Sequence, residues 1–364
     1  MPTPAGLTDP PVIPNLKDAD LMVDVAIVGA GPVGLFAAFY AGLRSLSAKL
    51  IDSAEVVGGQ LAAFYPSQSI YDVPGYPGVL ARDLTHLLDQ QAALAQPTIC
   101  PGELVQRLEP IPSSAASARG WRIVTDKGSH RARTVLLAVG AGRIWSKRLA
   151  IPFAVRFEGH GLHYQLQDIT SFSGRHVLVV GGAEAAVSAV LKLSKVASRV
   201  TLVHQHSELA VTDALLDRLR QPAVDVRLNC ELVNLDGTGH VTSALLNDQR
   251  RREQSQVAVD DVLVQIGYDV SLRPIQDWNV KIEANGIRVD HTMKTSLPGV
   301  FAAGDIAVYP GKIKLIAVGF SEAAIAINHA NQYLKPHEKL FPGYSTSVGP
   351  KRLPNLRKRG ESAI

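Results

Sequence analysis

The chain has 364 residues, and its size and composition indicate a soluble globular protein with two domains. Hydrophobic residues make up 46% and charged residues 19%, which excludes a disordered or fibrous chain. The formal net charge of +4 gives no sign of nucleic-acid binding. The two cysteines, Cys100 and Cys230, exclude a disulfide framework and a cysteine-rich zinc site, and they favour a reducing, cytoplasmic location.

The first 43 residues predict an N-terminal arm followed by a strand and a helix. Residues 1–21 are rich in proline and lack the features of a secretory signal, so we expect a flexible arm. The uncharged run Val25–Leu43 is long enough to cross a membrane. However, Gly29, Gly31 and Gly34 follow a β-branched stretch inside this run, as they do where a buried parallel strand turns into a helix. We therefore expect no membrane span.

One βαβ pattern occurs twice in the chain. Residues 24–52 can be laid over residues 176–204 without a gap. In each copy an apolar strand meets a glycine-rich turn, a helix rich in Ala and Leu follows, and a second strand ends at a polar residue. The sequence thus predicts an α/β protein with two Rossmann-like, three-layer nucleotide-binding domains.

The order of the later segments predicts that the second domain is inserted into the first. Strands over Val224–Leu228 and Val257–Ile266 complete the second domain. A brief strand then ends at Gly304-Asp305, before an amphipathic helix from about Leu315 to Tyr333, and this arrangement fits the carboxyl edge of the first sheet. The predicted boundaries are 22–138 and 292–348 for the first domain, 139–291 for the second, and 349–364 for a mobile basic tail.

The first glycine turn predicts a dinucleotide site. In the pattern Gly29-x-Gly31-x-x-Gly34, the first glycine permits a tight turn, the second lets a pyrophosphate approach, and the third lets the helix pack on the strand. Asp52, at the end of the next strand, can accept hydrogen bonds from a ribose diol. Because the strand, helix and acid all have the expected spacing, we favour nucleotide binding over a purely structural turn.

Further motifs along the chain resemble a known family. Gly58-Gly59-Gln60-Leu61, Asp72-Val73-Pro74-Gly75 and the segment Thr295–Asp305 resemble FAD-dependent pyridine-nucleotide oxidoreductases of thioredoxin-reductase type. Within that group, Tyr65-Pro66, Ile70–Val73, Gly311–Ala317 and Ser345–Ser347 are similar to thioredoxin-reductase-like ferredoxin–NADP reductases. A thioredoxin reductase would carry a CxxC pair in the second domain, and this chain has none.

The resemblance implies an FAD-binding homodimer and assigns roles to individual residues. Asp52 would bind the adenosine ribose, Asp305 would hold the ribityl chain, and Tyr65 would stack on the flavin unless it is an ordinary core aromatic. Tyr344, where many relatives have His, would cover the other flavin face, often from the second subunit. The complete implied FAD set is Gly29, Gly31, Pro32, Gly34, Asp52, Gly59, Gln60, Leu61, Tyr65, Asp72, Gly304, Asp305, Ile316 and Tyr344.

The implied chemistry requires no catalytic residue of the protein, because the flavin itself accepts hydride and releases single electrons. The helix that begins near Leu315 would direct its positive end toward the flavin. His163, His204 and His206 do not form a metal-ligand pattern, so no metal is expected.

The second glycine turn departs from the family pattern. It reads Gly181-Gly182-Ala183, with a methyl group where a pyrophosphate would approach. The family has His-Arg-Arg at the following strand end to bind the 2′-phosphate of NADPH, and this chain has His204-Gln205-His206. The sequence therefore leaves open whether NADPH binds. A neutral Gln205 is more compatible with NADH than with NADPH, but no acidic residue at this strand end selects the ribose diol of NADH.

Three functions remain possible from the sequence. The chain can move electrons through FAD between NAD(P)H and ferredoxin or flavodoxin. It can instead be an FAD oxidoreductase that takes electrons from a small-molecule substrate or another donor, or a non-catalytic FAD-binding scaffold. For an acidic carrier, the candidate docking residues are Arg143, Lys147, Arg148, Lys312 and Lys314.

Overall fold

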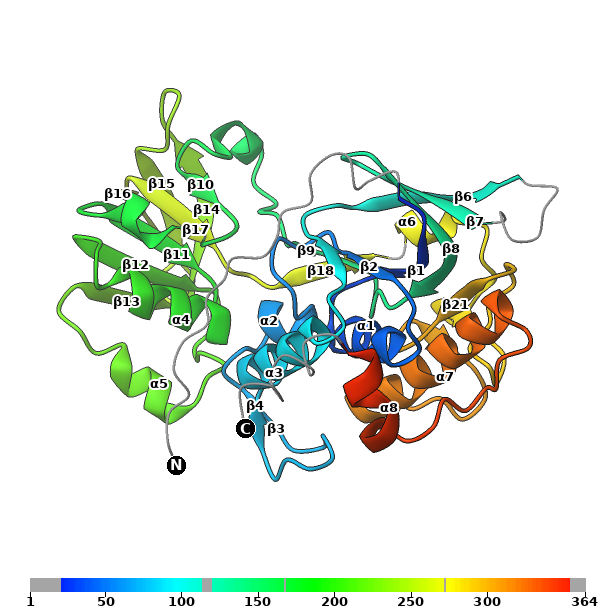
Figure 1. The fold of residues 1–364 in the computed structure, drawn as a ribbon. Helices are drawn as coiled ribbons and strands as arrows, with labels where there is room; N and C mark the ends of the chain where they lie inside the picture. The colour runs from blue at the N-terminus through cyan, green and yellow to red at the C-terminus, as the bar shows by residue number, and fades with distance from the viewer. Residues whose placement is uncertain (1–20, 113–119, 167, 272, 354–364) are drawn as a thin grey trace. The chain divides into compact units, whose positions relative to one another are not determined.

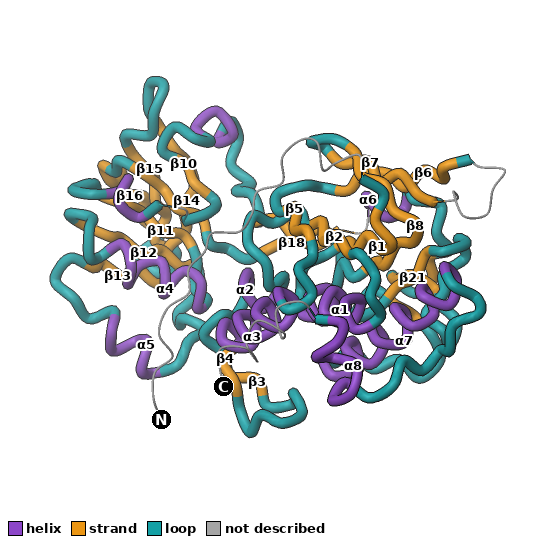
Figure 2. Tube along the Cα trace, in the orientation of Figure 1, coloured by secondary structure: helices purple, strands orange, loops and turns teal. Residues whose placement is uncertain are grey.

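The computed structural model describes residues 21–112, 120–166, 168–271 and 273–353 (Figures 1 and 2). The predicted N-terminal arm lies outside these residues, except for Leu21. The chain forms two compact units: unit 1 comprises the residues up to Arg143 and from Ser271 onward, and unit 2 comprises Ile144–Val270. Unit 2 is therefore inserted into unit 1, as the sequence predicts.

Unit 1 contains a parallel sheet that continues into an antiparallel hairpin. The strand order is β5-β2-β1-β8-β7-β6, and β21 pairs with β8. The second half of β8 pairs in parallel with β1 and β21, whereas its first half pairs antiparallel with β7. The bounds are β1 (Val23–Val28), β2 (Ala48–Ile51), β5 (Thr98–Cys100), β6 (Val105–Ile111), β7 (Gly120–Thr125), β8 (Ser129–Leu137) and β21 (Val300–Ala302).

Helices α1, α3 and α7 lie on one side of the parallel strands, and the β6–β7 hairpin, into which the sheet continues, lies on the other side (Figure 1). Both faces of β1 are covered, and Val25, Ala26 and Ile27 are fully buried. For this reason the second half of β1 is apolar throughout and does not alternate between apolar and polar residues. The helices are α1 (Pro32–Leu43), α2 (Gln60–Ala63), α3 (Ala81–Ala93), α6 (Arg273–Gln276), α7 (Ile316–Leu334) and α8 (Ser345–Arg352). Short strands complete the unit: β3 (Ser69–Ile70), β4 (Val79–Leu80), β19 (Ile282–Glu283), β20 (Gly286–Arg288) and β22 (Ala307–Val308).

Unit 2 has a five-stranded parallel sheet in the order β10-β17-β11-β12-β13 and a three-stranded antiparallel sheet, β14-β15-β16. Their bounds are β10 (Leu162–His163), β11 (His176–Val180), β12 (Arg199–His204), β13 (Val224–Leu228), β14 (Cys230–Asp236), β15 (Ser243–Asp248), β16 (Glu253–Ala258) and β17 (Asp261–Val264). The helices are α4 (Glu184–Leu193), α5 (Asp213–Arg218) and the 3₁₀ turns η3 (Ala154–Phe157) and η4 (Ile169–Phe172). The two connections between the units pair as β9 (Arg143–Ser146) with β18 (Tyr268–Ser271).

The repeated pattern and most predicted elements are confirmed, with one exception in unit 2. β1, α1 and β2 correspond in order to β11, α4 and β12, and α7 lies within one residue of its predicted bounds. The predicted strand Val257–Ile266 is instead two strands of different sheets, β16 and β17. The chain turns between them at Val259 and Asp260, where the Asp260 side chain accepts a hydrogen bond from the His176 backbone N–H.

The boundary between the units lies about twenty residues earlier than residue 292, where the sequence places it. Trp278 is 2% exposed in the core of unit 1, and its indole N–H donates to the Gln106 carbonyl of β6 at 2.9 Å. Ile275 and Val280 belong to the same core. Residues 273–291 therefore pack with unit 1 because three large apolar side chains are buried there.

The predicted mobile tail does not begin at residue 349. Helix α8 extends to Arg352. The Arg352 guanidinium donates a hydrogen bond of 2.7 Å to the Leu43 carbonyl at the end of α1. Leu353 is 1% exposed and lies against Gly42 of α1. No helix among the described residues is both long enough and apolar enough to cross a membrane.

We expect the substitution Leu353→Ala to lower the free energy of unfolding by about 2–5 kcal/mol, because it removes a fully buried side chain from the α1–α8 contact. Urea unfolding measures this change. Ser347→Ala, at an exposed position of the same helix, is the control and should have little effect. Equal stability of the two variants would contradict the docking of α8 on α1.

Candidate dinucleotide site

The predicted site residues of unit 1 converge at the carboxyl edge of its parallel strands. Gly29 follows β1, Asp52 follows β2, Gly140 lies in the loop after β8, and Gly304 follows β21. The carboxyl edge of such a sheet is where nucleotides bind in α/β folds. The fold thus brings together four segments that are far apart in the sequence.

The three glycines of the first turn have different structural roles. Gly29 has φ +107°, and a Cβ there would collide with the Ala138 carbonyl, while a Cβ on Gly34 would collide with the Gly29 carbonyl oxygen. Gly31 differs from both, because its φ of −72° suits any residue and a Cβ there would meet only Gly59 Cα, at 3.8 Å. The fold needs glycine at Gly29 and Gly34, whereas glycine at position 31 keeps a space open.

A second glycine turn forms the other wall of that space. Gly58 and Gly59 both have positive φ, at +116° and +55°, and the Gly58 N–H donates to the Ala30 carbonyl at 2.8 Å. A Cβ on Gly59 would approach Gly31 Cα at 3.0 Å. The two backbones therefore form a cradle, defined here by Gly31 and Gly59, which has no side chain in it.

The start of α1 gives this cradle a preference for anions. The helix has no side-chain cap and no acidic residue in its first turn, and Pro32 occupies its first position. Free backbone N–H groups and the positive end of a helix dipole bind phosphate groups. The open cradle and the uncapped helix together fit the diphosphate of FAD.

Asp52 lies beside the first turn, but its carboxylate already has two backbone partners. It accepts hydrogen bonds from the N–H groups of Ala30, at 2.5 Å, and Ala54, at 2.8 Å. Burial raises the pKa of Asp52, and these two hydrogen bonds oppose the rise. Each carboxylate oxygen keeps acceptor capacity for a ribose hydroxyl, so Asp52 can both brace the turn and bind a ribose.

Two neighbouring residues of the implied FAD set have different surroundings. Gln60 begins α2, and its side-chain amide lies near Gly140, where a Cβ would approach Nε2 at 3.2 Å. Leu61 is 1% exposed and belongs to the hydrophobic core. Gln60 is thus placed at the sheet edge, whereas Leu61 acts by packing.

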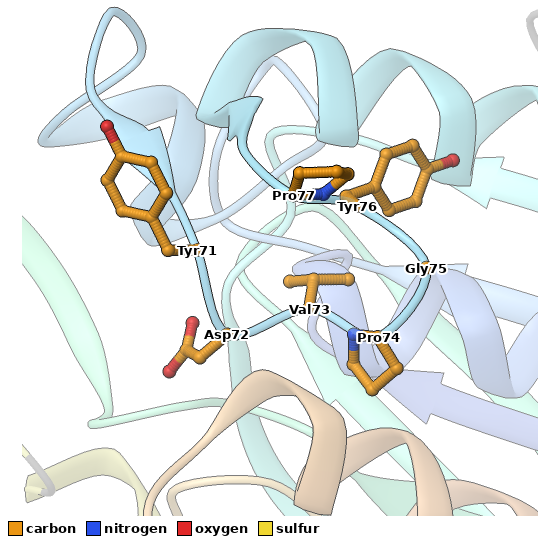
Figure 3. Close-up of a pocket in the computed structure, with 7 residues that line it drawn as sticks. All are labelled: Tyr71, Asp72, Val73, Pro74, Gly75, Tyr76 and Pro77. Carbon is orange, nitrogen blue, oxygen red and sulfur yellow. The ribbon is translucent and has the colours of Figure 1, made fainter.

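Tyr65, Asp72 and Asp305 share one electrostatic environment. The pKa of Tyr65 is raised by burial first, and then by the negative charges of Asp305 and Asp72. Asp72 belongs to the hollowed loop Tyr71–Pro77, where its carboxylate projects on the same side as Tyr71 and away from Tyr76 (Figure 3). Asp305 is far from Tyr65 and Asp72 in the sequence, and the fold brings its charge within range of Tyr65.

A buried carboxylate that the sequence did not single out holds the Gly304-Asp305 turn. Glu322 of α7 is 2% exposed and accepts hydrogen bonds from the Gly304 N–H at 2.7 Å, from the Tyr309 hydroxyl at 2.5 Å and from Lys312 Nζ at 2.5 Å. Burial, and then the hydrogen bond to Glu322 and its negative charge, raise the pKa of Tyr309 to about 12. The sequence did contain a sign of this role, because Glu322 is the single acidic residue among the mostly apolar residues of α7.

This contact corrects the expectation for Lys312. Its side chain is only 7% exposed and forms an ion pair with Glu322, so it is a structural cation and cannot dock an acidic carrier. Lys314 is exposed and keeps that capacity. Arg148 forms an ion pair with Glu158 at 2.6 Å and lies over the Tyr164 ring.

The last two members of the predicted FAD set lie at helix starts. Ile316 begins α7, which has neither a side-chain cap nor an acid in its first turn, and Gly319 of that helix lies close to Gly304. Tyr344 precedes α8, is 73% exposed, and packs edge-on against Phe341. Within the described part of one chain, no ring contact joins Tyr344 to Tyr65.

Unit 2 contains a second turn of the same design. Gly181 has φ +152°, and a Cβ there would collide with the Gln265 carbonyl. Ala183 precedes α4 with an extended conformation close to that of Gly31, and its methyl group is exposed. Glu184 adds a negative charge to the first turn of α4. The Ala183 methyl group therefore takes up space that is open at Gly31, and the Glu184 carboxylate makes this turn less favourable than the first one for binding an anion.

The strand end beside the second turn is folded against it. The His204 ring lies over Gly182 and hydrogen-bonds to the Glu208 backbone, and burial lowers the pKa of His204. The Ala210 N–H donates to the Gly182 carbonyl at 2.8 Å. Gln205 and His206 are exposed, and their side chains hydrogen-bond to each other at 3.1 Å. All six predicted residues of the second site thus lie together.

A third polar group lies in unit 1, away from the glycine turns. Cys100, Glu103 and His130 place one possible ligand atom each within 4.8 Å of one another. His130 Nε2 is 2.8 Å from Glu103, and Lys49 Nζ is 3.4 Å from His130 Nδ1. Burial raises the pKa of Cys100 to about 11, so its thiol is protonated at neutral pH. A buried ammonium group beside a protonated thiol opposes binding of a cation.

Known proteins resemble this chain over most of its length. The model of the family described as pyridine nucleotide-disulphide oxidoreductase matches residues 23–323. A ferredoxin–NADP reductase of Geobacillus kaustophilus is 41% identical over 335 residues, which cover 92% of this chain and 99% of that protein. A ferredoxin–NADP reductase 2 of Shouchella clausii is 40% identical over 328 residues, covering 90% and 98% of the two chains.

A solved structure shares the fold. The crystal structure of T. acidophilum thioredoxin reductase is 26% identical to this chain with a TM-score of 0.60, and the match covers 86% of this chain and 98% of the other. The predicted thioredoxin-reductase-like arrangement, with two nucleotide-binding domains, is thereby confirmed.

The cradle predicts opposite outcomes for two similar substitutions. Gly31→Ala should leave the fold intact, since its Cβ meets nothing closer than 3.8 Å, yet it should weaken FAD binding because the methyl group enters the space for the diphosphate. Gly34→Ala should unfold or strongly destabilise the protein. Thermal unfolding and FAD titration of the apoprotein distinguish these effects. Normal FAD affinity in a folded Gly31→Ala protein would refute the cradle's role.

The buried ion pair predicts a stability effect. Glu322→Gln leaves the charge of Lys312 buried without a counter-ion, so the free energy of unfolding should fall by about 3–5 kcal/mol. Adding Lys312→Met removes that charge and should restore most of the stability. Urea unfolding of both variants measures the difference. If the free energy of unfolding of Glu322→Gln alone lay within about 1 kcal/mol of the wild-type value, the ion pair would not have the importance assigned to it.

Proposed function

The chain belongs to the pyridine nucleotide-disulphide oxidoreductase family, and we propose that it moves electrons through FAD between NAD(P)H and ferredoxin or flavodoxin. It is a flavin-dependent oxidoreductase. The observation that carries the proposal is the open cradle between Gly31 and Gly59, at the sheet edge where Asp52 follows β2 and Asp305 lies beyond β21. The cradle would offer backbone N–H groups to the diphosphate of FAD, and the two carboxylates would accept hydrogen bonds from its hydroxyl groups.

The cysteines argue against reduction of a disulfide by the protein's own dithiol. The chain has two cysteines, and both are buried free thiols in separate units. A dithiol mechanism needs two sulfurs close enough to form a bond, with Cα atoms within about 7 Å. Without that pair the chain has no dithiol of its own to receive electrons from the flavin, which favours an external electron acceptor. The free thiols also suit a reducing compartment such as the cytoplasm.

The protein's own residues bind, orient and set charge. A bound FAD supplies the exchange of a hydride for two single electrons. The Gly31–Gly59 cradle and the start of α1 would hold its diphosphate, and Asp52 would bind a ribose. Glu322 accepts a hydrogen bond from the Gly304 N–H, and the neighbouring Asp305 would bind the ribityl hydroxyls. The uncapped start of α7 at Ile316 adds a positive dipole end, which favours negative charge nearby.

Unit 1 also offers an apolar groove that supports a homodimer. Its lining comes from α1, α3, α7 and the loop of Figure 3, and includes Phe36, Pro74, Tyr76, Leu87 and Phe320. Tyr76 and Leu87 are each 39% exposed. Exposed apolar patches of this kind mark protein interfaces. A second copy could also bring an exposed Tyr344 to the flavin of its partner, as the resemblance implies.

A second function is favoured by one observation in unit 2. The exposed Ala183 methyl stands where the equivalent Gly31 leaves space, and Glu184 adds a negative charge there. If these two features exclude nicotinamide dinucleotides, the chain is an FAD oxidoreductase that takes electrons from a small molecule or another protein.

Anaerobic mixing distinguishes the two functions. We expect NADPH or NADH to bleach the visible absorbance of the FAD-loaded protein in a saturable way, and oxidised ferredoxin or flavodoxin to restore it. Reduction by neither nucleotide, but by reduced ferredoxin, would leave a flavoprotein that does not use nicotinamide. No reduction by any of these donors would contradict the proposed function.

A further inference from the structure

Three consecutive arginines lie at the nucleotide-binding edge of unit 2. Arg250, Arg251 and Arg252 form the turn between β15 and β16, and all three are exposed. This segment, which we call the arginine turn, is some forty residues beyond the strand end where the family places its phosphate-binding arginines. The arginine turn and residues 205–206 are therefore far apart in the sequence, and only the fold can bring them close together.

Backbone hydrogen bonds connect the arginine turn to that strand end. The Asn229 N–H donates to the His206 carbonyl at 2.9 Å, and the Gln249 N–H donates to the Asn229 carbonyl at 2.8 Å. His204 of β12 pairs with Leu228 of β13, and Cys230 of β14 pairs with Asp248 of β15. Gln249 is thus separated from His206 by two strand-to-strand spacings, or about 10 Å, and Arg250 is the next residue in the chain. An arginine side chain can span most of that distance.

The turn is built so that its guanidinium groups remain available. The Asp248 carboxylate accepts hydrogen bonds from the backbone N–H groups of Arg250, at 2.9 Å, and Arg251, at 3.0 Å, and these bonds lower the pKa of Asp248. Asp248 therefore acts mainly as a cap of the turn, and its nearest guanidinium contact, to Arg251, is 4.0 Å long. Among the described residues, neither Arg250 nor Arg252 has a carboxylate within ion-pair distance.

This contrasts with other arginines of unit 2. Arg148, Arg175, Arg199 and Arg227 each pair with a carboxylate at 3.2 Å or less. Glu231 and Glu253 lie on the neighbouring strands, so the patch is not strongly positive overall. A phosphate monoester would be recognised here by bidentate guanidinium hydrogen bonds rather than by a long-range field.

We propose that the arginine turn binds the 2′-phosphate of NADPH, replacing the two arginines that positions 205 and 206 lack. The inference rests on the proposed function in one respect: a dinucleotide must bind at the second glycine turn, with its adenosine ribose at the end of β12. Gln205 and His206 then contact the ribose, and Arg250 and Arg252 contact the phosphate attached to it. The protein therefore prefers NADPH to NADH although its strand end carries no arginine.

Binding of adenosine 2′,5′-bisphosphate tests the proposal without any electron transfer. Calorimetric titration of the FAD-loaded protein compares this ligand with 5′-AMP, which lacks the 2′-phosphate. We expect the wild type to bind the bisphosphate more tightly. Arg250→Gln/Arg252→Gln should weaken bisphosphate binding by about tenfold or more, because charge-assisted hydrogen bonds are lost, and should leave 5′-AMP binding unchanged.

Arg199→Gln/Arg220→Gln is the matched control. It removes the same charge from exposed positions at the opposite, amino edge of β12 and β13 and should not change the preference. Equal loss in the two double variants, or a wild type that does not prefer the bisphosphate, would overturn the proposal. Arginine-dependent bisphosphate binding in a protein that neither NADPH nor NADH reduces would instead refute the proposed function and leave the phosphate site in place.

Discussion

The close approach of α1 to β1, with no side chain between them, is the constraint on which the site depends. Gly34 lies so near the Gly29 carbonyl that any Cβ would collide with it, and Gly29 itself needs a positive φ. This contact places the first turn of α1 at the carboxyl edge of the sheet. The open space at Gly31, the hydrogen bond from Gly58 and the position of Asp52 all follow from that placement.

In unit 2 the same turn design differs by the Ala183 methyl group and the Glu184 charge, and these two changes alter which ligand the site can bind. Ala183 has nearly the backbone conformation of Gly31, so the substitution has little effect on the fold and acts on the ligand. Recognition at this site can then be shared with elements outside the repeated βαβ unit. The β14–β15–β16 sheet supplies such an element, because its arginine turn is hydrogen-bonded through Asn229 to the end of β12.

Buried charge has a different role in unit 1. Glu322 and Lys312 are both almost fully covered, and the pair is satisfied by the Tyr309 hydroxyl and the Gly304 N–H. Burying an ion pair gives little net stability, but it fixes geometry when each partner is hydrogen-bonded. Here the fixed geometry is that of the Gly304-Asp305 turn, which links the last strand of the sheet to the polar part of the site.

The two βαβ units, the glycine turns and the inserted domain could be predicted from the sequence, because strand and helix periods and glycine spacing are local properties of the chain. The sequence also identified the altered second turn at Ala183. The packing of residues 273–291 and 349–353 could not be predicted in this way, since burial of Trp278 and Leu353 depends on segments that are distant in the sequence. The same holds for Lys312, a candidate docking residue by sequence, which pairs with Glu322 in the fold, and for the arginine turn, which reaches the strand end only through hydrogen bonds between strands.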